Sequence, residues 1–260
     1  MQAGRKVAVA GATGRLGHHL VEVLTADGHD VVAMSRATGV DIVSGEGLAD
    51  ALPGVECIID AATGPSPDQQ EATDFFSRAA RNLHEAGEQA GVKRMIVVSI
   101  IGIDQFTGGY SAAKLAHEQA MLAGPIAVDV VRAAQFHEFV AQLVDWGRQG
   151  DVSYVQQMRT QPVAARSLAV VLAGLATNPD ASTPLGGAGA PFLEVAGPRE
   201  ESMVELAKRL TARRGDPLRI EGVSDPSDPD SHLSASGALL PGPGAILTGP
   251  TFDAWLDAAS

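Results

Sequence analysis

A short apolar run followed by three regularly spaced glycines constrains this chain more than any other feature. Val7-Ala8-Val9-Ala10 is typical of a buried strand, and Gly11, Gly14 and Gly17 follow it. Gly11 permits a sharp exit from the strand, Gly14 lets a pyrophosphate approach the backbone, and Gly17 lets a helix pack closely. Apolar side chains then recur on one helical face, at Leu16, Leu20, Val23 and Leu24. Because the helix N-terminus faces the turn, the segment predicts a dinucleotide-binding site.

The end of the next apolar run, at residues 30–34, indicates which dinucleotide fits. A carboxylate at this position normally binds the ribose 2'-hydroxyl of NAD, but this chain has Ser35 and Arg36 there. A guanidinium can bind a 2'-phosphate through two hydrogen bonds, and Ser35 can donate another. Arg15 in the turn adds a second positive charge. The pattern favours NADP(H) over NAD(H), the alternative being that both arginines are ordinary surface residues.

Short apolar runs alternate with segments of helical period, as in repeated strand–helix–strand units. We expect strands at 6–10, 30–34, 56–61, 93–99, 127–132 and 192–196. A helix is expected over about 70–90, with a buried stripe at Phe75, Ala79, Leu83, Ala86 and Ala90. The expected fold is α/β: a Rossmann-type, doubly wound, mostly parallel sheet. We expect one NAD(P)-binding domain over 1–260, with residues from about 135 onward adding a small C-terminal portion that covers and binds the substrate.

Composition excludes several other classes of protein. The chain has 260 residues, 19 basic and 31 acidic, so its net charge is −12, which repels nucleic acids and anionic membrane surfaces. No apolar run reaches the length of about 18 residues that a membrane-spanning helix needs. The single cysteine, Cys57, cannot form an internal disulfide, and no cysteine or histidine cluster has metal-ligand spacing. We therefore expect a cytoplasmic protein without a metal, without nucleic-acid partners and without membrane contact.

Several motifs together resemble the short-chain dehydrogenase/reductase superfamily, in its atypical NmrA-like, NAD(P)H-binding branch. The resemblance rests on Gly11 to Gly17 and on three further segments: Val97-Val98-Ser99-Ile100-Ile101-Gly102-Ile103-Asp104, Tyr110-Ser111-Ala112-Ala113-Lys114-Leu115-Ala116-His117-Glu118 and Val131-Arg132-Ala133-Ala134-Gln135-Phe136-His137-Glu138-Phe139. It implies a catalytic set in which Ser99 orients a substrate carbonyl and Tyr110 donates the proton. Lys114, one helical turn after Tyr110, would hold the nicotinamide ribose and lower the pKa of the tyrosine.

Further residues are candidates for contact with the cofactor and the substrate. Thr13, Arg15 and Leu16 would bind the cofactor at the turn, together with the glycines. The remaining candidates for cofactor contact are Asp41, Ala61, Ala62 and Thr63. Gln135, Phe136 and His137 follow the fifth strand at the carboxyl edge of the sheet, where ligands bind in such folds, and are the candidate substrate-pocket residues.

The function that these features favour is an NADPH-dependent reductase that transfers hydride to a carbonyl or to a conjugated, quinone-like small molecule. One alternative is an NADP-binding redox sensor that regulates a protein partner without turnover. Another is an NAD(P)-dependent isomerase or epimerase that returns the hydride. The sequence leaves the substrate and the oligomeric state open.

Overall fold

The computed structural model describes residues 4–178, 192–224 and 230–258. The chain forms two compact units. The first comprises residues 1–99, 109–132 and 168–193, and the second comprises 100–108, 133–167 and 194–260. Every residue expected to bind the cofactor, and the Ser99, Tyr110 and Lys114 set, belongs to the first unit. Gln135, Phe136 and His137 belong to the second.

A seven-stranded sheet of order β12-β9-β5-β4-β3-β1-β2 forms the centre of an α/β, Rossmann-type fold. Its strands are β1 (Lys6–Ala10), β2 (Asp30–Met34), β3 (Cys57–Asp60), β4 (Arg94–Ile100), β5 (Ala127–Ala133), β9 (Leu193–Ala196) and β12 (Ile246–Leu247). β1 pairs in parallel with both β2 and β3, and β3 pairs in parallel with β4. The expected fold class is therefore confirmed, and β1 and β2 have the predicted bounds.

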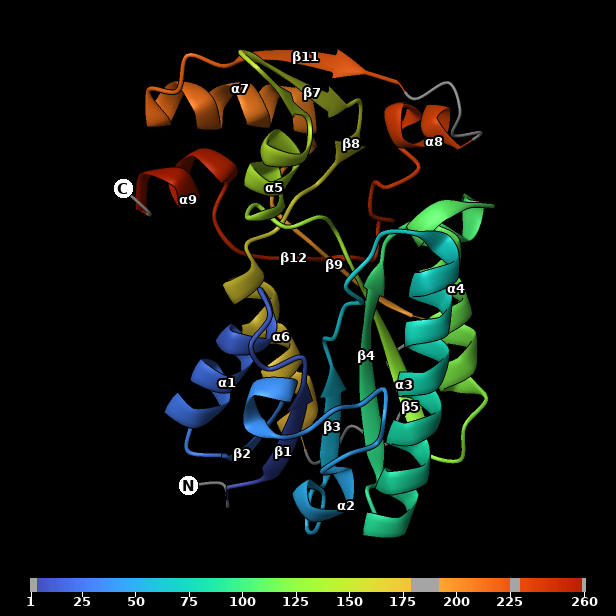
Figure 1. The fold of residues 1–260 in the computed structure, drawn as a ribbon. Coiled ribbons are helices and arrows are strands. Elements are labelled where there is room, and N and C mark those ends of the chain that lie inside the picture. Colours follow the sequence, from blue (N-terminus) through green and yellow to red (C-terminus); the bar gives the residue numbers. More distant parts are fainter. Residues whose placement is uncertain (1–3, 179–191, 225–229, 259–260) are drawn as a thin grey trace. The chain divides into compact units, whose positions relative to one another are not determined.

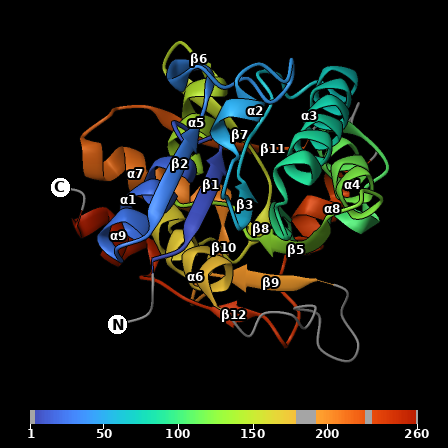
Figure 2. The same cartoon turned by 90° about the horizontal axis from the view of Figure 1, so that it is seen from below.

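Helices cover both faces of this sheet within the first unit. They are α1 (Gly17–Ala26), α2 (Leu48–Ala51), α3 (Gln69–Ala90), α4 (Gly109–Leu122) and part of α6 (Ala165–Thr177), with the 3-10 turn η1 (Arg36–Thr38) after β2. Figures 1 and 2 show α3 and α4 side by side on one face, with α1 on the opposite face. The helix α4 carries Tyr110 and Lys114, and Ser99 lies near the end of β4.

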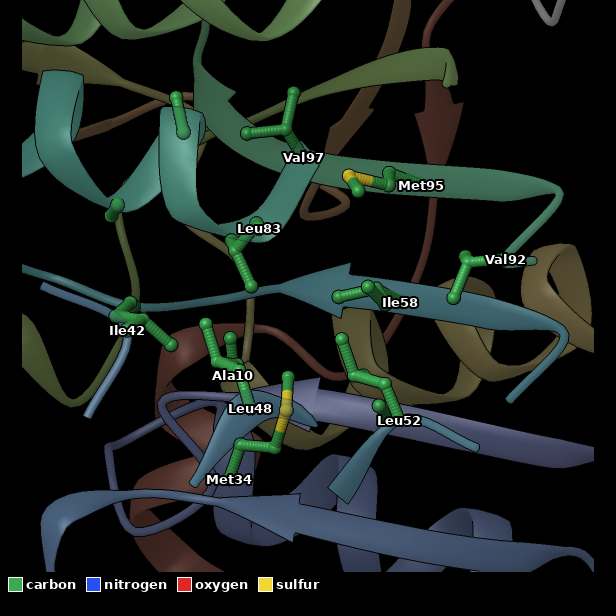
Figure 3. Packing of buried hydrophobic residues seen from close by; sticks show 14 of the residues in the cluster. Ala10, Met34, Ile42, Leu48, Leu52, Ile58, Leu83, Val92, Met95 and Val97 are labelled. Carbon is green, nitrogen blue, oxygen red and sulfur yellow. The ribbon is translucent and has the colours of Figure 1, made fainter. Parts of the chain in front are cut away.

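The core of the first unit lies between the sheet and α3. Figure 3 shows Ala10, Met34 and Ile58 of the strands facing Leu48 and Leu83 of the helices. These side chains are almost fully removed from water, and burial of apolar surface of this kind supplies most of the stability of such a layer.

The buried stripe of α3 is rotated from the predicted one. Phe76 is 1% exposed, whereas Phe75 is only partly buried, and Ala86 and Ala90 also lie at the margin of the core. Residues fully buried on α3 are Ala72, Phe76, Ala79, Ala80, Leu83, His84 and Gly87. Neighbouring stripes of a helix this rich in alanine have similar apolar content, and packing against α4 selects the one that includes Phe76.

The second unit has small sheets and helices of its own. Its sheets pair β6 (Arg148–Gln149), β7 (Val152–Gln156) and β11 (Arg219–Val223), and separately β8 (Arg159–Thr160) and β10 (Glu201–Ser202). Its helices are α5 (Phe139–Trp146), α7 (Met203–Arg214), α8 (Ser231–Ser236) and α9 (Phe252–Ala258), with the 3-10 turn η2 (Ile103–Gln105). Val140, Leu206, Leu210 and Phe252 are among the residues of its apolar core.

The close approach of Gly17 to the preceding turn gives a prediction about stability. A Cβ at Gly17 would lie 2.0 Å from the backbone oxygen of Gly11, which cannot move without distorting the turn. We expect Gly17→Ala to lower the free energy of unfolding by about 3 kcal/mol, because backbone overpacking has no flexible side chain to relieve it.

Gly174→Ala is the matched control. Gly174 lies on α6 with open space around the position of a Cβ, so alanine should be neutral or stabilise by up to about 1 kcal/mol. Urea unfolding of the two variants measures both effects. Equal stabilities would contradict the tight helix–turn packing.

Candidate active site

The glycine turn after β1 connects the ends of three strands. Gly11 has φ +77°, a left-handed conformation that favours glycine, and its N–H donates to the Met34 carbonyl at the end of β2 at 3.0 Å. A Cβ at Gly11 would lie 2.8 Å from the Cα of Ala62, just after β3. The turn can therefore lie against the ends of β2 and β3 only if this position carries no side chain.

The turn presents an open helix N-terminus. Leu16, the residue that precedes α1, makes no side-chain hydrogen bond to the first turn of the helix, and the first turn contains no acidic residue. Thr13, Gly14 and Arg15 are exposed beside it. N–H groups without a side-chain cap, next to a guanidinium, fit an anionic pyrophosphate.

The residues that follow β2 and β3 lie at the same end of the sheet as the glycine turn. Arg36 is exposed, and Ser35 is held by a reciprocal capping interaction with Thr38 in η1. Asp41 accepts hydrogen bonds from the N–H groups of Val43 and Ser44 through Oδ1, so one of its oxygens stabilises its own turn. Ala61 and Thr63 are accessible, whereas Ala62 is buried. An adenosine-binding role for Asp41 stays a prediction.

Lys114 is the central charged group of the site. It is only 4% exposed on α4, and its Nζ donates to the backbone oxygen of Val98 on β4 at 2.8 Å. Nζ also lies 2.9 Å from Nδ1 of His117 and 4.5 Å from the centre of the Phe76 ring. Burial lowers the pKa of the lysine to about 8, against the raising effects of the Asp60 and Glu118 carboxylates.

His117 links the lysine to a buried carboxylate. Its Nε2 lies 3.1 Å from Oδ2 of Asp60, and Oδ1 of Asp60 accepts the N–H of Ala62 at 3.0 Å. Burial and the Lys114 charge lower the pKa of His117. Burial alone would raise the pKa of Asp60, but its contact with His117, the Lys114 charge and the Ala62 N–H together lower it. Asp60 is therefore a carboxylate and His117 a neutral imidazole at pH 7.

Phe76, on α3, covers the row of contacts formed by Asp60, His117 and Lys114. Its ring stacks on His117, with ring centres 4.4 Å apart and planes 18° apart. The edge of Tyr110 meets the same ring at 6.0 Å between centres. Phe76 thus shields both the lysine and the histidine from water while contacting the candidate proton donor.

The expected effect of Lys114 on Tyr110 is wrong for this structure. Burial and the Asp60 carboxylate raise the pKa of Tyr110 to about 12, and Lys114 is not among the causes of the shift. The physical reason is that the ammonium of Lys114 donates to Val98 and contacts His117. Tyr110 is consequently a protonated phenol at neutral pH.

Ser99 lies at the end of β4 and is 3% exposed. Within the described part of the chain, its Oγ has no hydrogen-bond partner. A buried hydroxyl without a partner is costly, so such a group is explained well by a ligand atom that it binds.

A second buried ion pair supports the same helix. Glu118 accepts two hydrogen bonds from the Arg132 guanidinium on β5, each of 2.9 Å. The Arg132 guanidinium also lies 3.5 Å from the centre of the Phe192 ring. Lys114, His117 and Glu118 therefore form one polar, buried face of α4, and two positive and two negative charges balance around it.

The candidate substrate residues lie within the second unit. Gln135 accepts a hydrogen bond from Thr160, and Phe136 forms an isolated bridge with Val163. His137 is 1% exposed, with its Nε2 3.2 Å from the Pro250 carbonyl and its ring against Phe252. In the described residues its Nδ1 has no partner. Substrate contact by these three residues stays a prediction.

Sequence reasoning assigned no role to His117 and none to Asp60 or Phe76. One signal was present, because His117 and Glu118 follow Lys114 by three and four positions and so share its helical face with buried Ala113 and Met121. Polar groups on an apolar helix face need partners. The partners themselves come from β3 and α3, which no local pattern could reveal.

The described residues contain no group of three or more histidine, cysteine, aspartate or glutamate side chains arranged to hold a metal ion. In the same ranges, no helix has both the length and the apolar character needed to cross a membrane.

Comparison with known families matches residues 11–179 to the NAD(P)H-binding family. Among curated proteins, a segment is 34% identical over 118 residues to the 3-diazoavenalumate denitrifying reductase of a Streptomyces species, covering 36% of this chain and 38% of that protein. Matched segments cover only 31% to 38% of the curated relatives' own lengths.

Solved structures resemble the whole chain. A UDP-N-acetylglucosamine 4-epimerase from Bacillus cereus has a TM-score of 0.68 at 18% identity, covering 98% of this chain and 95% of that one. A dTDP-4-dehydrorhamnose reductase from Bacillus anthracis, in complex with NADP, has a TM-score of 0.67 at 19% identity, covering 99% and 98%. These similarities show the fold.

The buried Glu118–Arg132 pair gives a second prediction. Glu118→Gln leaves the guanidinium buried without its counter-charge, so we expect the free energy of unfolding to fall by about 3–5 kcal/mol. Glu205→Gln is the control, because its pair with Lys208 is exposed and should contribute at most about 1 kcal/mol. Urea unfolding measures both changes, and a loss at Glu118 no larger than at Glu205 would contradict the role of the buried pair.

Proposed function

This chain belongs to the NAD(P)H-binding family, and on that premise we propose that it is an NADPH-dependent reductase. Its substrate would be a small molecule with a carbonyl group or a conjugated, quinone-like system. The observation that carries the proposal is the arrangement of Lys114 and Tyr110 on one helix. Lys114 is a buried cation held by Val98 of β4 and by His117, and Tyr110 is a phenol that stays protonated.

Lys114 supports cofactor binding through its remaining donor. An ammonium has three N–H groups, of which one donates to Val98 and one is directed at His117. The third is available to a ribose hydroxyl. Together with the open N-terminus of α1, this cation fits the two ends of a dinucleotide.

Tyr110 and Ser99 support a reduction. Reduced nicotinamide, held by Lys114 through its ribose, would provide the hydride for the electrophilic carbon of the substrate. Ser99 donates a hydrogen bond to the substrate oxygen, and Tyr110 gives its phenol proton to that oxygen as negative charge develops there. Solvent then returns a proton to Tyr110. With a pKa of about 12 the phenol is protonated at neutral pH, which is the form that a proton donor needs.

The preference for NADPH is proposed from charge. Arg36 is exposed directly after β2, and Arg15 lies in the exposed turn before α1. Neither position offers a carboxylate to a ribose 2'-hydroxyl, whereas two guanidinium groups suit a 2'-phosphate.

The proposed substrate-binding residues belong to the second unit. Gln135, Phe136 and His137 would bind the small molecule, with His137 as a neutral imidazole because burial lowers its pKa. We propose no nucleic-acid or membrane partner, since the net charge of −12 opposes both.

Deuteride transfer tests the reductase proposal. The protein is mixed with NADPH deuterated on either face of nicotinamide C4 and a pool of aldehydes, ketones, enones and quinones, and products are read by mass spectrometry. Label should enter one product from one face. Tyr110→Phe should slow this transfer by about 10²–10⁴-fold while NADPH still binds, because only the acid is lost.

Tyr154→Phe is the matched control, since Tyr154 lies partly exposed on β7 in the second unit and should leave the rate unchanged. Tight NADPH binding with no label in any product would contradict the reductase and favour a redox sensor. Product formation without net NADPH consumption would favour an isomerase or epimerase.

Arg36→Ala tests the cofactor preference. Loss of a charged hydrogen bond to the 2'-phosphate should weaken NADPH binding about 10–100-fold and leave NADH binding nearly unchanged. Arg78→Ala, on the exposed side of α3, is the control and should change neither affinity. Titration of nucleotide fluorescence measures the dissociation constants of each variant for NADPH and NADH. An equal loss of affinity for NADH and NADPH in Arg36→Ala would contradict the assignment of Arg36 to the 2'-phosphate.

A further inference from the structure

Asp60, His117 and Lys114 form a chain in which each donor and acceptor can be assigned. Oδ2 of Asp60 faces Nε2 of His117 at 3.1 Å, and Nδ1 of the same ring faces Nζ of Lys114 at 2.9 Å. An ammonium only donates hydrogen bonds, so Nδ1 of His117 must accept from Lys114. In a neutral imidazole Nε2 then carries the ring proton, and it faces the Asp60 carboxylate at 3.1 Å without the alignment of a hydrogen bond.

The Lys114 contact therefore assigns the tautomer of the His117 ring, and the Asp60 carboxylate favours the same tautomer through its charge near Nε2. Stacking on Phe76 holds the plane of His117, and the Val98 carbonyl fixes a second N–H of Lys114. Two of the three ammonium donors are thereby directed at protein atoms. The third has a defined direction because the other two are held.

We propose that Asp60 and His117 are positioning residues that hold the Lys114 ammonium with one N–H left for the nucleotide, so that cofactor affinity follows the protonation of Lys114. This rests on the proposed function for the identity of the ligand. The contacts among Asp60, His117 and Lys114 form without a nucleotide, and neither Asp60 nor His117 needs to touch one.

The charges around Lys114 determine the pH at which it loses its proton. Asp60 faces it through His117 from β3, and Glu118 lies one turn along α4, where Arg132 of β5 already neutralises it. Tyr110, on the same helix, is an uncharged phenol at neutral pH. Asp60 is thus the carboxylate left to balance the ammonium, and its removal should favour the neutral amine.

The direction of the pH effect follows. With the pKa of Lys114 at about 8, the ammonium is present below pH 8 and is lost above it. NADPH affinity should therefore be constant below pH 8 and fall above it, at most tenfold for each pH unit. Asp60→Asn should move this decline to lower pH by about one unit, because it removes a nearby negative charge.

The ring tautomer is tested on the free wild-type protein. Long-range ¹H–¹⁵N spectra of histidine-labelled protein at pH 7 distinguish the two neutral tautomers and the cation, and His117→Gln assigns the signal. We expect the Nε2–H tautomer. An Nδ1–H tautomer or a cation would contradict the proposed contacts among Asp60, His117 and Lys114, whatever the protein's function.

The affinity profile is tested by NADPH titration from about pH 6.5 to 9.5. The wild type should show the decline near pH 8, Asp60→Asn should show it earlier, and Lys114→Met should show none. His117→Asn keeps the Asp60 charge and an acceptor for Lys114 but removes the ring between them, so its decline should stay near pH 8 while its NADPH affinity below pH 8 falls about tenfold. Asp50→Asn, exposed on α2, is the control and should match the wild type.

The two proposals fail in different ways. Absence of NADPH binding by the folded wild type overturns the proposed function and the cofactor part of this inference. The tautomer spectrum still tests the proposed contacts among Asp60, His117 and Lys114. Normal NADPH binding with an unshifted decline in folded Asp60→Asn overturns the positioning role alone. If Asp60→Asn does not fold, His117→Asn tests the positioning role, because an NADPH affinity below pH 8 equal to that of the wild type would overturn it.

Discussion

The buried ammonium of Lys114 is the constraint on which the candidate site depends. A charge removed from water must be compensated, and here a backbone carbonyl of β4, a neutral imidazole and a carboxylate at the end of β3 do so. The carbonyl and the carboxylate come from adjacent strands because a parallel sheet places the carboxyl ends of its strands along one edge, whereas the imidazole lies on α4 itself. The chain order that forms the sheet thus also places the site.

The same edge explains why the glycine turn and the lysine belong to one site. Gly11 lies against Ala62, and Ala62 donates its N–H to Asp60, which faces His117. A continuous set of contacts therefore runs from the proposed phosphate-binding turn to the proposed catalytic helix, all within the first unit. Phe76 closes this set on the α3 side by stacking on His117.

Much of this could be predicted from local patterns. The bounds of β1 and β2, the order of strand, turn and helix at Gly11 to Gly17, and the shared face of Tyr110 and Lys114 all depend on neighbours within a few residues. The roles of Asp60 and Phe76 could not, since the partners lie far from His117 in the chain. The raised pKa of Tyr110 was also beyond local reasoning, because it arises from burial and from Asp60.

A crystal structure of the protein with NADP⁺ would test the account most directly. The account predicts the pyrophosphate at the turn between Gly11 and Gly17, the 2'-phosphate at Arg36, and a ribose hydroxyl within hydrogen-bond distance of the Lys114 Nζ. His117 would still lie between Lys114 and Asp60. A nucleotide bound away from the turn, or a Lys114 side chain directed away from a bound nucleotide, would contradict it.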